Sequence, residues 1–266
     1  MSSIRVAALY RYPVKGLSPE KLGRATLEAR AYFPGDRMFA IENGPSGFDP
    51  SAPEHQPKIK FLMLMKQEAL ARLKTRYDDA TATLHITLEG EPVLAAPVTT
   101  EAGRATISAF FMRYIPGDLR GSPQWLRAPD GFRFTDSRAG YVSLINLASV
   151  AALEQRLDAP LDSLRFRSNI HLEGLPPWAE FDLLGQELVA PSGLRLKVTK
   201  RIDRCAATTV DPVTGIRDLP VVKTLMTAFG HVDCGVYCEI IAAGTLSEGE
   251  RLRVSEIQAP ASLGLR

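Results

Sequence analysis

Short runs in which apolar and other residues alternate are the feature that most restricts how this chain can fold. Three such runs are Ile4, Val6 and Ala8; Leu84, Ile86 and Leu88; and Leu194, Leu196 and Val198. Successive side chains of a β-strand point to opposite faces, so each run predicts a strand that is buried on one face. Strand patterns outnumber helical ones, and the sequence therefore predicts a mainly β fold of the α+β class with interspersed helices.

Helical patterns are fewer. In residues 146–157, "NLASVAALEQRL", four apolar residues share one helical face: Leu147, Val150, Leu153 and Leu157. Asn146 can cap the start of this helix, and Pro160 prevents its continuation. The run "FLMLMKQEALARL" at 61–73 contains no Gly or Pro. It fits either a strand that continues from Lys58 or a short helix.

Two segments rich in Gly and Pro interrupt these patterns. Residues 43–58, "NGPSGFDPSAPEHQPK", form a loop too long for a simple connection, and we expect a flap over a site. Residues 116–131, "PGDLRGSPQWLRAPDG", separate two strand-rich halves. We therefore expect two domains, residues 1–120 and 121–266, as two interlocked β-barrel-like units.

Composition excludes several classes of partner. The 32 Lys and Arg residues nearly balance the 30 Asp and Glu residues, which gives little reason to expect a nucleic-acid partner. The longest apolar runs are far shorter than the roughly 20 residues that cross a bilayer, so no membrane span is expected. The first ten residues, "MSSIRVAALY", contain Arg5 and do not resemble a secretion signal. We expect a cytoplasmic protein.

The cysteine and histidine patterns do not indicate a zinc site or a disulfide framework. There are three cysteines, an odd number that fits a reducing compartment. Cys234 and Cys238 lie in an alternating apolar run, and we expect them in the core. The four histidines are scattered, without the spacing of a zinc hydrolase.

Four stretches place cationic and polar residues among apolar ones. They are "YPVKGL" (12–17), "PGDRMFAI" (34–41), "RFRSNI" (165–170) and "RIDRCAATTVDPVTG" (201–215). Arg165, Arg167 and Asn169 would share one side of a strand. Such a side does not suit a dry apolar core, so it faces water, a carboxylate or a bound anion such as a phosphate.

Cys205 is the residue in these stretches with the most reactive chemistry. The neighbouring Arg204 favours the thiolate over the thiol, which makes the sulfur a better nucleophile and a better ligand for a soft metal. Thr208 and Thr209 add hydroxyl donors, and "DPVTG" is a turn. Cys205 can equally be a small buried apolar residue beside a surface cation. The residues alone leave these alternatives open.

Together the four stretches resemble a known family. The sequence is similar to MOSC domain proteins that also carry the MOSC N-terminal β-barrel domain, the arrangement of the mitochondrial amidoxime-reducing component and its bacterial relatives. "YPVKGLSPEKL" and "PGDRMFAI" resemble the N-terminal domain. "RFRSNI" and "RCAATTVDPVTG" resemble the MOSC domain, and "GTLSEGERLRV" resembles its closing strand and turn.

The resemblance implies a site for the molybdenum cofactor, a molybdenum–molybdopterin. Cys205 takes the place of the metal ligand and catalytic residue. The contacts to the pterin and its phosphate carry over to Lys15, Gly16, Arg37, Arg167, Asn169, Arg204 and Thr208. The chain departs from the common family pattern at three positions: many relatives have Ser at the place of Gly16, many have Pro at the place of Ser168, and some have a second Cys at the place of Ile202.

The resemblance also implies a function. We expect a molybdenum-dependent oxidoreductase that reduces N-hydroxylated compounds at the N–O bond. Some bacterial relatives contain a fused ferredoxin domain; this chain ends at "ASLGLR" without one, so we expect a separate electron donor, either ferredoxin or a cytochrome b5-like protein with its reductase. The alternative is a non-catalytic carrier of the cofactor or a sulfur-transfer module. A β-rich binding domain without a cofactor is a third interpretation.

Overall fold

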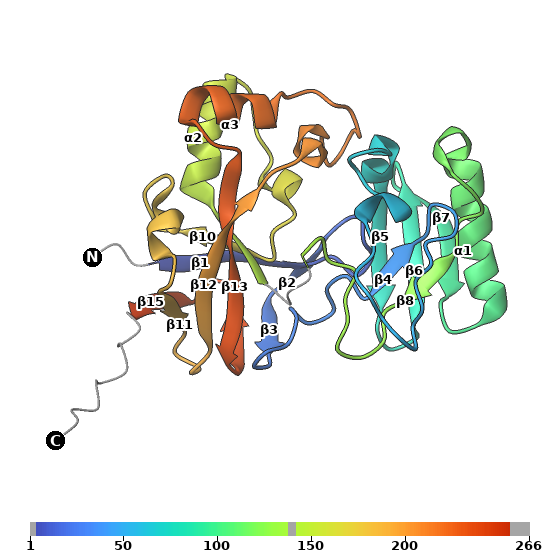
Figure 1. Ribbon diagram of the computed structural model, residues 1–266, viewed down its shortest axis with the longest axis horizontal. Coiled ribbons are helices and arrows are strands. Elements are labelled where there is room, and N and C mark those ends of the chain that lie inside the picture. Colours follow the sequence, from blue (N-terminus) through green and yellow to red (C-terminus); the bar gives the residue numbers. More distant parts are fainter. Residues whose placement is uncertain (1–3, 138–141, 256–266) are drawn as a thin grey trace.

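The alternating run at the start of the chain forms the strand that closes the larger sheet. In the computed structural model, which describes residues 4–137 and 142–255, seven strands form a closed barrel (Figure 1). In order around the barrel they are β10 (Ile170–Glu173), β9 (Val142–Asn146), β13 (Asp233–Ala242), β12 (Arg195–Asp203), β11 (Glu187–Val189), β15 (Arg251–Ser255) and β1 (Ile4–Arg11), with β2 (Glu20–Leu22) paired to β1. Only β9 and β10 run parallel among these pairs. The predicted mainly β fold is confirmed.

The barrel core is made by the inward-facing residues of these strands. Ile4 and Val6 of β1 and Leu196 and Val198 of β12 are buried, as the alternation predicts. Cys238 lies in the same apolar cluster. Cys234 is equally buried in a neighbouring cluster, where burial raises the pKa of its thiol to about 12. The prediction that these two cysteines are core residues is confirmed.

Two helices cover one end of the barrel. The predicted helix is present as α2 (Leu147–Leu157), and the Asn146 side chain accepts a hydrogen bond from the Ala148 backbone N–H (3.1 Å). It packs against α3 (Val221–Phe229), which the sequence pattern does not predict. Their shared cluster contains Val150, Leu153, Val221, Leu225 and Phe166.

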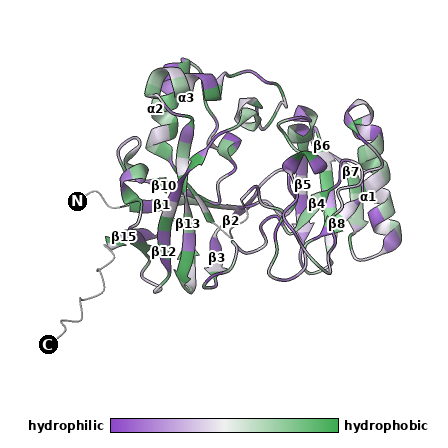
Figure 2. Cartoon of the chain, viewed as in Figure 1, coloured by the Kyte–Doolittle hydropathy of each residue, from purple (hydrophilic) through white to green (hydrophobic). Residues whose placement is uncertain are grey.

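The second lobe is a smaller β structure with one helix. It consists of the antiparallel sheet β5 (Leu73–Asp78), β6 (Thr83–Leu88) and β7 (Glu91–Pro97), the pair β4 (Phe39–Ile41) and β8 (Trp125–Arg127), and α1 (Glu101–Tyr114). The alternating run at 84–88 is therefore a strand, as predicted, and its Leu84 and Ile86 are fully buried. Figure 2 shows apolar and polar residues interleaved along the strands and helices of both lobes.

Short 3-10 helices complete the structure. They are η1 (Lys58–Lys60), η2 (Glu68–Arg72), η3 (Pro116–Asp118), η4 (Ser163–Phe166), η5 (Ala179–Leu183) and η6 (Ala206–Thr209). The run at 61–73 is thus a turn followed by η2, and the interpretation of a strand continuing from Lys58 is wrong. Its apolar residues supply separate contacts, because Phe61 and Leu62 are buried in different clusters.

The two halves of the sequence exchange strands. β1 comes from the first half but pairs with β10 and β15, and β3 (Arg24–Leu27) pairs with β14 (Gly244–Ser247). In the opposite sense, β8 from the predicted boundary segment pairs with β4. "GTLSEGERLRV", which we expected to form a closing strand and a turn, forms two strands, β14 and β15, with a turn between them. None of the helices in the described ranges is long and apolar enough to cross a membrane.

Candidate functional site

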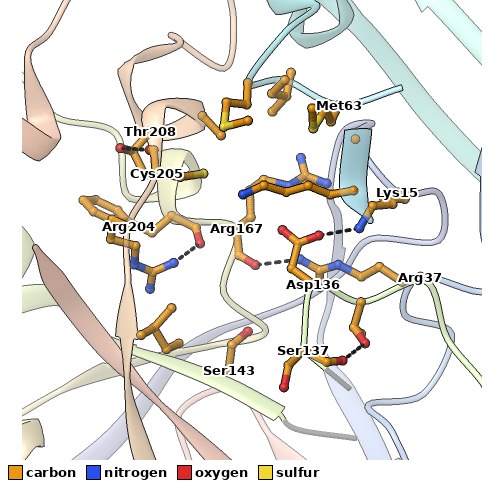
Figure 3. Close-up of a pocket in the computed structure, with 18 of the residues that line it drawn as sticks. Lys15, Arg37, Met63, Asp136, Ser137, Ser143, Arg167, Arg204, Cys205 and Thr208 are labelled. Atoms are coloured by element: carbon orange, nitrogen blue, oxygen red, sulfur yellow. Dashed lines mark hydrogen bonds and ion pairs between the residues drawn. The ribbon is translucent and has the colours of Figure 1, made fainter. Parts of the chain in front are cut away.

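A cavity of about 400 Å³ is lined by residues from both halves of the chain. All eight residues that the sequence predicts for the site line this one cavity: Lys15, Gly16, Arg37, Arg167, Asn169, Arg204, Cys205 and Thr208. His55 and Lys58 of the predicted flap also line it. Figure 3 shows the cavity with Cys205 and Thr208 on one side and Lys15 and Arg37 on the other.

Cys205 lies directly after β12, where the chain turns into η6. Its backbone is extended (φ −110°, ψ 176°), and it forms the N-cap position of η6. The Cys205 carbonyl accepts hydrogen bonds from the Thr208 backbone N–H (3.1 Å) and hydroxyl (2.9 Å). The thiol is half-buried and forms no disulfide. The loop is therefore fixed through its backbone, which leaves the sulfur directed toward the cavity (Figure 3).

Arg37 and Arg167 lie over the same aromatic ring. Their guanidinium carbons are 4.5 Å and 4.4 Å from the centre of the fully buried Tyr12 ring. Arg37 donates to Asp36 (2.5 Å) and to the Arg167 carbonyl (3.1 Å). Burial lowers the pKa of Arg37, but the charge of Asp36 outweighs it, so the pKa is raised overall. Arg37 is thus a fully charged group held in place at the cavity wall.

Arg167 has no carboxylate partner within residues 4–137 and 142–255. One terminal nitrogen, Nη1, donates to the Leu17 carbonyl (2.7 Å), while the buried Nη2 has no hydrogen-bond partner in the part of the chain that the structure describes. Burial, followed by repulsion from Arg37, lowers the pKa of Arg167 to about 10, so the group still carries its charge at neutral pH. A buried donor without a partner is costly, and its position beside a cavity points to an anionic ligand.

Lys15 reaches the cavity from the turn after β1. Its ammonium donates to the Phe134 carbonyl (3.0 Å) and forms an ion pair with Asp136. Burial lowers the pKa of Lys15, and the Asp136 charge opposes this only in part. Burial would raise the pKa of Asp136, but Lys15 brings it down to about 2. The Asp136 side chain remains more than half exposed, so water screens this pair.

Arg204 lies beneath the cysteine loop and does not point at the sulfur. Its guanidinium donates to the Phe166 carbonyl (2.8 Å) and, through Nε, to the Cys234 carbonyl (2.7 Å). Burial lowers its pKa. Its positive charge is present near Cys205, but its hydrogen bonds connect the cysteine loop to η4 and β13.

Asn169 and Gly16 shape the cavity wall. The Asn169 side chain accepts from the Ser143 hydroxyl (2.8 Å) and donates to the Tyr10 carbonyl (3.2 Å), so it connects β9 and β1. Gly16 has a positive φ of 82°, and a Cβ there would lie 2.6 Å from the Leu62 carbonyl oxygen. Any residue with a Cβ would therefore clash with the backbone at this place.

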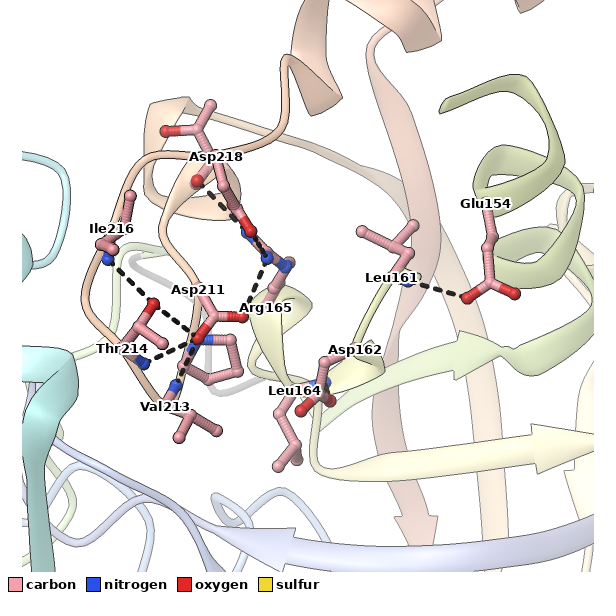
Figure 4. Close-up of polar contacts among 12 residues, drawn as sticks. Glu154, Leu161, Asp162, Leu164, Arg165, Asp211, Val213, Thr214, Ile216 and Asp218 are labelled. Atoms are coloured by element: carbon pink, nitrogen blue, oxygen red, sulfur yellow. Dashed lines mark hydrogen bonds and ion pairs between the residues drawn. The ribbon is translucent and has the colours of Figure 1, made fainter. Parts of the chain in front are cut away.

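The predicted strand carrying Arg165 and Arg167 is wrong. Residues 163–166 form η4, where Asp162 caps the turn by accepting from the Leu164 N–H (2.8 Å), and Arg167 has a left-handed φ of 53°. The two arginines therefore do not extend from one side of a strand. Arg165 instead forms two hydrogen bonds of 2.8 Å to Asp218 and one of 3.0 Å to Asp211 (Figure 4).

Positive charge dominates the cavity. Its lining includes seven Lys and Arg residues and three carboxylates: Lys15, Arg37, Lys58, Arg165, Arg167, Lys200 and Arg204, with Asp36, Asp136 and Asp203. Cations and a buried donor of this kind suit an anionic ligand, and a thiol suits a soft metal.

Comparison with protein families identifies the two domains that the sequence motifs resemble. The model of the MOSC N-terminal beta barrel domain matches residues 3–121, and that of the MOSC domain matches residues 131–253. The chain is a MOSC domain protein. The cavity of this MOSC protein is lined by residues from both matched segments.

The match to an individual curated protein covers a smaller part of the chain than the family models do. The MOSC protein is 38% identical over 77 residues, 28% of its chain, to a molybdenum cofactor sulfurase of Caenorhabditis briggsae, and it spans about a tenth (10%) of that relative's length. Two crystal structures are similar at low TM-scores. The YUAD protein of Bacillus subtilis has a TM-score of 0.48 and 14% sequence identity, and the match covers 96% of this chain and 97% of that one. YiiM of Geobacillus stearothermophilus has a TM-score of 0.35 and 20% sequence identity, and the match covers 43% of this chain and 54% of that one.

Several residues of the MOSC protein's cavity escape the sequence analysis. Asp36 stands beside Arg37 in a stretch already singled out for its charge, so its pairing with that arginine was accessible to sequence reasoning. Asp136 and Ser143 have no local pattern that marks them. The consecutive apolar residues Met63, Leu64 and Met65 line the cavity from a stretch whose pattern indicated only secondary structure.

Proposed function

We propose that this chain is a molybdenum-cofactor-dependent oxidoreductase that reduces N-hydroxylated compounds at the N–O bond. The observation that carries the proposal is the meeting of the Cys205 thiol with Arg37, Arg167 and Lys15 around one cavity of about 400 Å³. The family assignment agrees with a role connected to the molybdenum cofactor.

The residues present fit this cofactor. Its phosphate would supply the acceptor that the buried Arg167 Nη2 lacks, and Arg37 lies beside it. A cysteine thiolate is a suitable ligand for its soft metal. In this proposal Cys205 holds the metal, while Lys15, Arg37 and Arg167 bind the anionic part. Gly16, Asn169, Arg204 and Thr208 keep the wall and the cysteine loop in place.

Reduction of a hydroxylamine group consumes two electrons and two protons and releases an amine and water. When bound, the cofactor would supply the two-electron chemistry. The chain's own part includes proton supply: Lys15 Nζ lies at the wall, and burial lowers its pKa, which makes its proton easier to release. The electrons would come from a separate donor, a ferredoxin or a cytochrome b5-like protein with its reductase. We also propose a cytoplasmic location.

A second candidate function is transport of the cofactor or of sulfur. The observation that favours it is the likeness to a molybdenum cofactor sulfurase over 77 residues. In this alternative Cys205 would hold the cofactor or a persulfide in transit, and the same cations would bind the anionic part. The two functions need the same cavity and differ in turnover.

The first experiment measures molybdenum and pterin per chain after expression in a host that makes the cofactor. We expect nearly one of each in the wild type and loss of the metal in Cys205→Ala, because the half-buried thiol is the proposed ligand. Cys234→Ala is the control, since this buried thiol does not line the cavity and its loss leaves the metal bound. A wild type free of both would overturn the proposal.

Turnover separates the two candidate functions. The loaded enzyme should oxidise a reduced artificial donor when hydroxylamine or an amidoxime is present. A loaded protein that oxidises the donor with neither substrate is a carrier.

A further inference from the structure

Arg217 lies outside the lining of the cavity and contacts the cysteine loop, residues 205–209. One terminal nitrogen of its guanidinium, Nη1, donates to the Ala206 carbonyl (3.1 Å) and to the Thr209 hydroxyl (3.1 Å). The backbone of Arg217 also forms an antiparallel bridge with the residue that follows the loop. Because Ala206 comes directly after Cys205, Arg217 binds the chain one residue from the thiol.

The other terminal nitrogen of Arg217 contacts the smaller lobe. Nη2 donates to the Leu64 carbonyl (3.1 Å), the Met65 carbonyl (2.9 Å) and the Glu68 carboxylate (3.1 Å). Leu64 packs against the core of that lobe, and both Leu64 and Met65 line the cavity. A single guanidinium, whose side chain is only 32% exposed, therefore connects the cysteine loop to a turn of the other lobe.

Two further contacts bring the same segments together. The Lys74 ammonium donates to the Pro212 carbonyl (2.6 Å). Gly215 has a positive φ of 71°, and a Cβ there would lie 3.0 Å from the Glu68 carbonyl oxygen. The loop at residues 210–218 thus packs closely on the smaller lobe, and Arg217 extends this connection to the cysteine loop.

The residues that we propose for cofactor binding are divided between the two connected parts. Cys205 belongs to the cysteine loop, whereas Lys15 follows Val14, a core residue of the smaller lobe. A ligand held at two ends is bound most tightly when the distance between the two attachment points is fixed.

We propose that Arg217 is a positioning residue that fixes the Cys205 thiol relative to the cations of the smaller lobe and thereby retains the cofactor. It acts through the cysteine loop, because its own hydrogen bonds go to protein groups and it lies outside the cavity lining. This inference rests on the proposed function and adds to it a residue that the ligand does not touch.

The test is a double-mutant cycle of Arg217→Ala and Cys205→Ala in which the rate of pterin release is measured. With Cys205 present, we expect Arg217→Ala to accelerate release about tenfold, which corresponds to about 1.4 kcal/mol. In Cys205→Ala no thiol remains to be positioned, so Arg217→Ala should change the rate less than about twofold. General damage to the fold would instead accelerate release equally in both backgrounds.

Two single variants separate the bridge from the charge. Arg217→Lys keeps the positive charge, but its one nitrogen cannot donate to both lobes in the way a guanidinium does, so we expect about the same tenfold effect as for Arg217→Ala. Glu68→Ala is the matched control. It removes the carboxylate partner, leaves the carbonyl contacts in place, and should change release less than about twofold.

Hydrogen exchange in the cofactor-free protein supplies a readout that needs no ligand. The Thr208 N–H donates to the Cys205 carbonyl (3.1 Å), and the Val210 N–H donates to the Ala207 carbonyl (3.2 Å). We expect both amides to exchange about tenfold faster in Arg217→Ala, because the cysteine loop then opens more often.

The outcomes separate this inference from the proposed function. Equal acceleration of pterin release in both backgrounds, wild-type release in Arg217→Lys, or unchanged exchange of the Thr208 and Val210 amides would each overturn the inference and leave the proposed function in place. A wild type without pterin would overturn the proposed function, and the exchange rates would still decide whether Arg217 fixes the cysteine loop.

Discussion

At the scale of single residues, Arg167 is the clearest indication of a ligand. It contacts one carbonyl and the Tyr12 ring, and its buried Nη2 has no hydrogen-bond partner among the residues that the structure describes. A folded protein keeps such a group only when something compensates for it, and in this cavity the compensation would be an anion. Arg165, two residues earlier, is equally cationic but has two carboxylate partners. Neighbouring arginines thus differ in what they can bind.

His171 gives a residue-scale prediction about pH. It is 2% exposed, and burial, followed by repulsion from Arg204, lowers its pKa from 6.5 to about 4. The folded state therefore holds the neutral ring, and below pH 6.5 the unfolded chain binds the proton first. This contribution to stability is complete above pH 6.5 and is lost as the pH falls toward 4, about 2 kcal/mol at pH 5.

Urea unfolding at pH 7 and pH 5 measures this effect. His171→Leu removes the titrating ring, so the variant should lose about 2 kcal/mol less than the wild type between the two pH values. Identical losses in both proteins would show that His171 does not control this pH dependence.

At the scale of elements, η4 and the loop at residues 210–218 form one unit. The Arg165 side chain is 1% exposed and joins η4 to Asp211 and Asp218 of the loop (Figure 4). Asp211 also accepts from the backbone N–H groups of Val213 (2.9 Å) and Thr214 (2.7 Å), which shapes the turn. The pairing thus determines the position of the segment that follows the cysteine loop.

Asp218→Ala tests this unit. Arg165 would keep only Asp211 and the Thr209 carbonyl, and we expect a loss of about 2 kcal/mol in the free energy of unfolding. A fully buried pair would cost more, but Asp218 is 39% exposed and is partly screened by water.

The control is Glu89→Ala, which removes a partner of Arg72 at an exposed ion pair and should cost less than about 0.5 kcal/mol. Equal effects of the two substitutions would mean that the buried arginine does not depend on Asp218.

At the scale of the whole molecule, β1 joins the two halves of the chain. It belongs to the first half of the sequence and closes the barrel between β10 and β15. Its Ile4, Val6 and Leu9 fill the barrel core. The cavity depends on the same arrangement, because Lys15 and Gly16 follow this strand closely.

Expression of residues 121–266 alone tests this dependence. Without β1 the barrel stays open and loses three core side chains, worth about 6 kcal/mol, which is comparable to the whole stability of an ordinary domain. We expect no cooperative thermal transition by near-ultraviolet circular dichroism. A monomer with a sharp transition would contradict this expectation. The division of the chain into two domains at residue 120 stays a prediction. It does not imply that either part folds alone.

The sequence predicts those elements whose pattern is local. The strands β1, β6 and β12 each contain a short run of alternation, and α2 has both an apolar face and a capping Asn146. The alternation and capping patterns do not predict α1 or α3. α3 begins with two valines, which favour strands, and has only nine residues, so its packing against α2 decides its conformation.

By itself, the sequence determined the mainly β class, the family and the eight residues gathered around the cavity, because these depend on short patterns and ordered motifs. Only the tertiary structure decided how those residues act. It turned Arg165 toward Asp218 and left Arg167 Nη2 without a hydrogen-bond partner among the described residues. Which groups lie opposite a side chain depends on contacts between segments far apart in the chain, and no local pattern encodes them.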